Sequence, residues 1–115
     1  MKKDLTRDYA TEAFRLYARC GSPSLKEIDG EGATAKDLRA VAEVLRILEL
    51  QGRPEVIAAV RAVYFVAPSR EIERGGIGAR VEAFAVGCPT SVPSVYRWLR
   101  QARKLFAELR GLRVR

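Results

Sequence analysis

Apolar residues recur at spacings of three and four along most of this chain, and no segment alternates convincingly between apolar and polar positions. That period is typical of helices that bury one face, so the pattern predicts an all-α fold, a compact helical domain of about five helices. In the first part of the chain, helices are expected at residues 5–20, 34–52 and 54–67, with one helical turn at residues 24–28.

Residues that commonly start or end helices stand at these limits. Gly21 is placed to end the first helix, because glycine readily adopts the left-handed conformation that follows many helices. Thr34 and Asp37 resemble a capping box at the start of the second helix. Pro54 suits the first position of the third helix, and Pro68 is expected to stop it.

Two further helices are expected in the C-terminal third of the chain. The first begins near Ile77, after a charged and glycine-rich stretch at residues 69–78 that we interpret as a loop and a candidate hinge. Ser91 and Pro93 mark the start of the second helix, because a hydroxyl acceptor stands just ahead of a proline in the first turn. Gly111 is expected to end it. The apolar stripe of this last helix consists of Val95, Trp98, Leu99, Ala102, Leu105, Phe106 and Leu109.

The formal net charge of +7 is concentrated at the C-terminal end. Residues 1–94 hold 14 Lys/Arg against 13 Asp/Glu, whereas residues 95–115 hold seven basic residues and a single acid, Glu108. A nearly neutral body therefore carries a strongly positive end, which is typical of a protein with a polyanionic partner.

The polar face of the last helix has the side chains of a recognition helix. Short hydroxyl and amide groups near its start suit contact with base edges, and arginines can donate in pairs to guanine or phosphate. We therefore predict binding to double-stranded DNA, with roughly five neutralised phosphates and a log–log salt dependence near −4 to −5. The predicted DNA-binding residues are Ser91, Ser94, Tyr96, Arg97, Arg100, Gln101, Arg103 and Lys104.

This segment also resembles a known type of DNA-binding unit. Pro-Thr-Ser-Val-Pro-Ser-Val-Tyr-Arg-Trp-Leu at residues 89–99, followed by Ala-Arg-Lys-Leu-Phe at residues 102–106, is similar to region 4 of sigma factors. It is similar too to late transcription regulators of Gram-positive phages of the RinA and ArpU type. The resemblance covers residues 77–112 and implies a sequence-specific helix-turn-helix, in some relatives working beside RNA polymerase.

The chain is accordingly divided into an N-terminal helical core, residues 1–68, and a C-terminal helix-turn-helix, residues 69–115, within one compact domain. The N-terminal helices are expected to form a core, with a homodimer interface or a contact with RNA polymerase as open alternatives. One departure from the compact repressor motif is a turn longer by one or two residues, with Pro89 where glycine is usual.

Several absences argue against an enzyme. The chain has no histidine, which is the commonest general base and metal ligand, and no nucleophile–base pair is visible. The cluster Gly75-Gly76-Ile77-Gly78 lacks the Lys-Ser/Thr of a phosphate loop and is interpreted as a turn. Cys20 and Cys88 are expected to be free thiols in or near the core. We expect no catalytic activity, no cofactor and no metal site.

Membrane and export functions are not expected either. The longest uninterrupted apolar run, Ala62 to Ala67, is far shorter than the ~20 residues that span a bilayer. Met1-Lys2-Lys3-Asp4 does not begin a secretory signal, so a cytoplasmic location is expected. Acidic residues at positions 4, 8 and 12, and the charged stretch 70–74, are interpreted as solvated.

Other interpretations of the C-terminal helix remain open at this point. It is alternatively the oligomer interface of a helical assembly or adaptor protein, such as a DNA-packaging subunit, or a surface helix with a solvated arginine face. RNA or an acidic protein is an alternative partner. Trp98 and Phe106 are expected in the core, whereas the role of Tyr96 is open. The arginines at positions 110, 113 and 115 are interpreted either as a frayed tail or as phosphate contacts.

Overall fold

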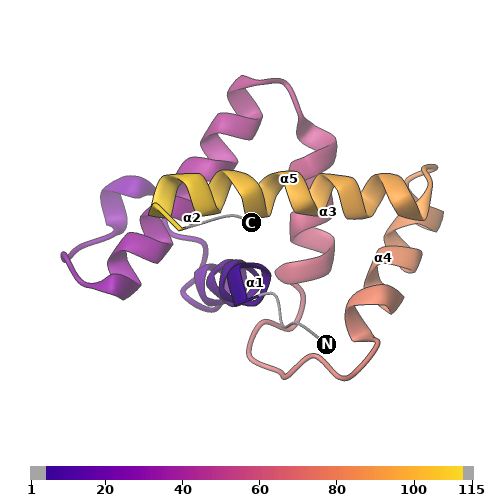
Figure 1. Cartoon of the computed structure of the whole chain (residues 1–115), viewed down its shortest axis with the longest axis horizontal. Coiled ribbons are helices and arrows are strands. Elements are labelled where there is room, and N and C mark those ends of the chain that lie inside the picture. Colours follow the sequence, from indigo (N-terminus) through magenta and orange to yellow (C-terminus); the bar gives the residue numbers. More distant parts are fainter. Residues whose placement is uncertain (1–4, 113–115) are drawn as a thin grey trace.

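The structure, a computed structural model, describes residues 5–112 and folds them into a helical unit of about 39 × 36 × 28 Å (Figure 1). The prediction of an all-α fold is confirmed for the described residues, which contain no strand. None of their helices is both long and apolar enough to cross a membrane. The elements are α1 (Leu5–Arg19), the 3-10 turn η1 (Leu25–Glu27), α2 (Ala33–Leu50), α3 (Pro54–Tyr64), α4 (Gly76–Gly87) and α5 (Val92–Arg110).

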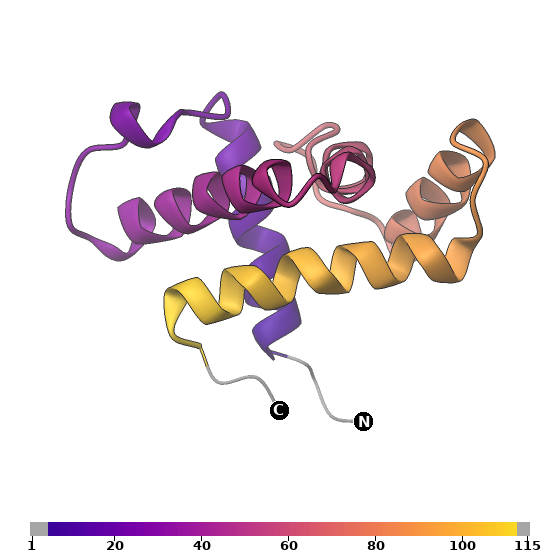
Figure 2. The same cartoon turned by 90° about the horizontal axis from the view of Figure 1, so that it is seen from above.

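Helix α5 lies across the other helices and packs against each of α1, α2, α3 and α4 (Figures 1 and 2). The reason is its apolar stripe, in which Val95, Leu99, Ala102 and Phe106 are all buried. These residues join those of the N-terminal helices in a single core cluster. The last helix is therefore part of the central core of the chain and not an appendage to it.

A row of aromatic rings links α1, α3 and α5 through this core. The rings of Phe14 and Tyr64 stack with their centroids 5.6 Å apart, and Phe14 also meets Phe106 at 5.9 Å. Tyr9 extends the row, with its ring centroid 6.1 Å from that of Phe106. Such pairs contribute about 0.5–1.5 kcal/mol each beyond the apolar area that they bury.

A polar cluster fastens the C-terminal end of α5 to α1 and α2. The Nε of Arg110 donates to Oδ1 of Asp37 at 2.6 Å, and the Tyr9 hydroxyl donates to the same carboxylate at 2.8 Å. The side chains of Arg110 and Asp37 are only 19% and 14% exposed. The hydrogen bond to Asp37, followed by that to Tyr9, raises the pKa of the Arg110 guanidinium. Arg110 is therefore a structural residue and not a frayed end.

Three predicted boundaries are wrong in detail. Helix α3 ends at Tyr64, before the predicted end at residue 67, so Pro68 does not stop it. Helix α2 begins at Ala33, with Gly32 as its N-cap and no side-chain cap, so Thr34 and Asp37 do not form a capping box. The cause is tertiary, because Asp37 is bound by Arg110 from α5. The glycines at positions 76 and 78 lie in the first turn of α4 and not in the preceding loop, which covers residues 65–75.

The two cysteines also differ from expectation. Cys20 and Cys88 are free, but both are exposed and neither belongs to the core. Each follows the last residue of its helix, at a point where the chain turns away from the packed face. The small apolar side chain of cysteine therefore does not predict burial at these two positions.

Candidate nucleic-acid interface

Helices α4 and α5 form a pair joined by the four-residue turn 88–91. Ser91 ends the turn as the N-cap of α5, and its Oγ accepts a hydrogen bond from the backbone N–H of Ser94 at 3.2 Å. The predicted helix start at Ser91 is thus confirmed, and Pro93 lies in the first turn of α5. A capped first turn holds the leading end of α5 in a defined conformation.

The pair packs through small and branched residues. Val81 of α4 is fully buried and Ala85 is 7% exposed, while Val95 of α5 is fully buried. A β-carbon on Gly78 would lie 3.5 Å from the hydroxyl oxygen of Tyr96, so this hydroxyl rests against the first turn of α4. The contact with α4 therefore occupies one side of α5 and leaves its opposite side to solvent.

That opposite side carries three cations in line, Arg97, Arg100 and Lys104, which we call the cationic stripe. Their spacings of three and four place them on one helix face, and all three are exposed. None of their side chains makes a hydrogen bond or ion pair with any residue in the range 5–112. The exposed acid Glu108 lies one turn beyond Lys104 and marks the C-terminal limit of the stripe.

Some arginine side chains elsewhere in the structure are paired with acids, whereas Arg61, Arg70 and Arg74 are exposed and, like the stripe, have no side-chain partner among residues 5–112. Arg46, Arg53 and Arg19 each form an ion pair with a nearby glutamate. By contrast, Arg100 and Lys104 are like charges at i, i+4 spacing, which destabilises a helix by about 0.2–0.5 kcal/mol. Internal pairing therefore does not explain the stripe, whereas a polyanion laid along α5 would relieve the repulsion.

The sequence predicts DNA binding by four basic residues of α5 and leaves the role of Arg110 open, but Arg103 and Arg110 are committed to the fold. Arg103 turns towards α3 and its Nη1 donates to the Tyr64 hydroxyl at 2.8 Å. Arg110 is bound by Asp37. Arg113 and Arg115 lie outside the described residues. The stripe is thus the part of the basic end that is free to meet a partner.

The remaining predicted DNA-binding residues lie on α5 or at its start, outside the stripe. Gln101 is half-buried on one side of the stripe, and Ser91 is exposed at the leading end of α5. Ser94 is half-buried and its Oγ accepts a hydrogen bond from Ser91 at 2.9 Å. Tyr96 is 40% exposed but leans on α4. The structure therefore places Arg97, Arg100 and Lys104 on one exposed face of α5, leaves Ser91 at the start of the helix, and holds Arg103 apart from them.

One polar cluster near this unit was not anticipated from the sequence. Arg80 of α4 donates from Nη1 to the carbonyl oxygen of Val63 at 2.7 Å, and Arg15 of α1 reaches the loop that precedes α4. Arg15 is 4% exposed although it is charged. Nothing in the local sequence marks Arg15, since its partners are backbone carbonyls more than 50 residues away.

Within residues 5–112 no group of three or more His, Cys, Asp or Glu side chains is placed to hold a metal ion. Comparison of the chain with protein-family models, with curated proteins and with solved structures finds no match. The geometry of α4 and α5 and the sequence of residues 77–112 therefore carry the argument on function.

Proposed function

We propose that the chain binds duplex DNA through the outward face of α5 and acts as a transcription regulator. The observation that carries this proposal is the cationic stripe, three exposed cations on one helix face whose side chains have no partner among residues 5–112. The turn 88–91 and helix α4 would complete a helix-turn-helix, in which the second helix enters the major groove.

The chemistry of the stripe suits this role. Arginine donates through a planar fork, either to two acceptors of a guanine or to a phosphate, and lysine supplies a point charge to phosphates. Ser91 at the leading end is short enough for close approach, and the amide of Gln101 suits adenine. The major groove, about 12 Å wide, admits a helix of this kind.

The sequence resemblance of residues 77–112 extends the proposal to a regulator related to those of phages or prophages. It adds RNA polymerase as a second partner. A homodimer formed through the N-terminal helices and a cytoplasmic location are further parts of the proposal that do not come from the resemblance. The alternative of an assembly protein that oligomerises through the apolar stripe of α5 is less favoured, because Val95, Leu99, Ala102 and Phe106 of that stripe are buried within the chain itself.

A selection experiment tests the proposal. The purified protein is mixed with a library of duplexes with random sequence, and bound duplexes are amplified over several rounds. We expect a common motif to emerge, and affinity for it to fall with salt at a log–log slope of about −2.7, as three phosphate contacts require. Failure to enrich any motif, together with binding that does not depend on salt, would contradict the proposal. Tighter binding of double-stranded RNA would redirect it to RNA.

A further inference from the structure

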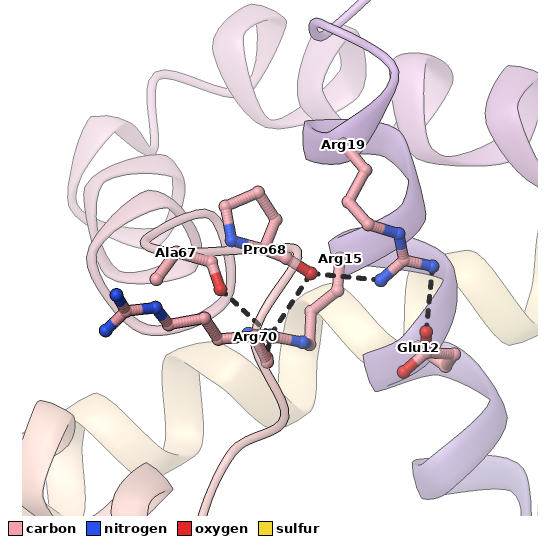
Figure 3. Close-up of polar contacts among 6 residues, drawn as sticks. All are labelled: Glu12, Arg15, Arg19, Ala67, Pro68 and Arg70. Atoms are coloured by element: carbon pink, nitrogen blue, oxygen red, sulfur yellow. Dashed lines mark hydrogen bonds and ion pairs between the residues drawn. The ribbon is translucent and has the colours of Figure 1, made fainter.

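The loop of residues 65–75 joins the N-terminal helices to α4, and two arginine side chains of α1 bind its backbone. From α1, the Nη2 of Arg15 donates to the carbonyl oxygens of Ala67 at 3.1 Å and Pro68 at 3.2 Å, and also to that of Arg70 (Figure 3). Arg19, one turn further along α1, donates from Nη1 to the Pro68 carbonyl at 3.1 Å. One guanidinium nitrogen of Arg15 thus donates hydrogen bonds to three carbonyl oxygens of a segment that has no regular secondary structure.

The environment of Arg15 is unusual for a charged residue. Among the described residues no carboxylate forms an ion pair with it, although Glu12, which is bound by Arg19 at 2.9 Å, lies nearby, and its buried Nη1 has no hydrogen-bond partner there. Burial, and after it the nearby charge of Arg80, lowers the pKa of the Arg15 guanidinium. Burying a charge that is incompletely paired destabilises a fold, so the contacts that it makes with the loop have a structural purpose.

The loop that Arg15 binds contains a residue with an unfavourable backbone conformation. Ala67 adopts a φ of +46°, in the left-handed region that residues with a β-carbon rarely occupy. Its own carbonyl is one of the three that accept from Arg15. A conformation of this kind persists only where the surroundings enforce it, and Arg15 supplies that constraint.

The far end of the loop meets α4 directly. A β-carbon on Gly76, the first residue of α4, would lie 2.7 Å from Cγ2 of Ile72, so the loop and the helix start are in close contact. Arg80 then ties α4 back to the end of α3 through Val63. Because α1 and α4 do not pack against one another in the described structure, Arg15 acts on α4 through the loop.

We infer that Arg15 is a positioning residue for the DNA-binding surface: by fixing the loop 65–75 it fixes α4, and with it the leading turns of α5. The DNA part of this inference rests on the proposed function, whereas the effect on the loop does not. Loss of Arg15 leaves the cationic stripe chemically intact but allows α4 to leave its place. If the competent arrangement is then populated about one tenth of the time, the affinity for duplex falls about tenfold.

The test uses R15Q, with R15K as a milder variant that keeps the charge but replaces the planar fork by a single ammonium. The matched control is R39Q, because Arg39 also donates to a loop carbonyl, that of Gly30, from a helix that does not contact α4. Two properties are measured: the rate of amide hydrogen exchange and the affinity for duplex as a function of salt.

We expect exchange in residues 65–87 to rise at least about tenfold in R15Q, less in R15K and not in R39Q, while the α2 and α3 core stays protected. Duplex affinity should fall about tenfold in R15Q with an unchanged salt slope, because no phosphate contact is lost. If R15Q fails to fold, R15K decides the question by the same two readouts.

The inference is overturned if exchange in the loop and α4 is the same in both Arg15 variants and in the wild type. A salt slope that becomes shallower by about one contact would also overturn it, since Arg15 would then touch phosphate itself. If the wild type binds no duplex at all, the proposed function fails, and the exchange measurement alone then decides whether Arg15 positions α4.

Discussion

The cationic stripe leads to a quantitative expectation for charge removal. In the triple variant R97Q/R100Q/K104Q, the core and the cap of α5 are untouched, since all three side chains are exposed and have no partner in residues 5–112. Each phosphate contact contributes about 0.9 to the log–log salt slope, so three contacts account for about 2.7. Over the tenfold range from about 1 M to about 0.1 M salt, a difference in slope of about 2.7 makes the duplex affinity of the triple variant roughly 500-fold lower than that of the wild type.

The matched control removes the same total charge from another surface. Lys26, Lys36 and Arg61 are exposed and lie on η1, α2 and α3, and their replacement by glutamine also lowers the net charge by three. We expect this K26Q/K36Q/R61Q variant to keep the slope of the wild type and most of its affinity. Unlike the stripe, these residues do not share one helix face.

Fluorescence anisotropy of a labelled duplex, titrated at several salt concentrations, measures both quantities, and circular dichroism confirms that each variant is folded. If the two triple variants lose affinity equally, the interaction follows net charge and not the stripe, and the outward face of α5 is not the DNA-binding surface. R103Q offers an internal check: because Arg103 is engaged by Tyr64, its loss should leave the slope unchanged.

Three further predictions concern the fold that presents the stripe. Replacing the fully buried Phe106 by alanine should lower the free energy of unfolding in urea by about 3–5 kcal/mol. S91A removes the acceptor that caps α5 and should cost about 1 kcal/mol, whereas S69A in the exposed loop should have no effect. Burial raises the pKa of Tyr17, so the folded state favours the neutral form of its hydroxyl. The free energy of unfolding should therefore fall as pH rises above about 10. Urea titrations repeated across pH measure this fall, and Y17F should abolish it.

Much of the helical framework follows from local patterns. The periodic apolar residues of α5, its serine cap and the glycine at position 111, whose φ is +70°, predict the helix and both of its ends. Pro54 similarly marks the start of α3. These features depend on residues within a few positions of one another, and local propensity and backbone sterics therefore suffice to predict them.

The assignment of the charged residues could not be made in the same way. Arg103 is separated from Tyr64 by 39 positions and Arg110 from Asp37 by 73, so only the tertiary arrangement shows that these two arginines are engaged. The estimate of five phosphate contacts is accordingly lowered to three. Asp37 illustrates the same limit, because its spacing from Thr34 suggests a cap while its actual partner comes from α5.

The central claim is that the outward face of α5 meets DNA, and mapping the contact by NMR tests it most directly. An isotope-labelled sample of the whole chain is titrated with the selected duplex, and shifts of backbone amides and arginine side chains are followed. The account predicts that the largest changes fall on residues 91–104, with Arg97 and Arg100 among them and Arg103 much less affected. Changes centred on α1 and α2, with α5 unperturbed, would contradict it.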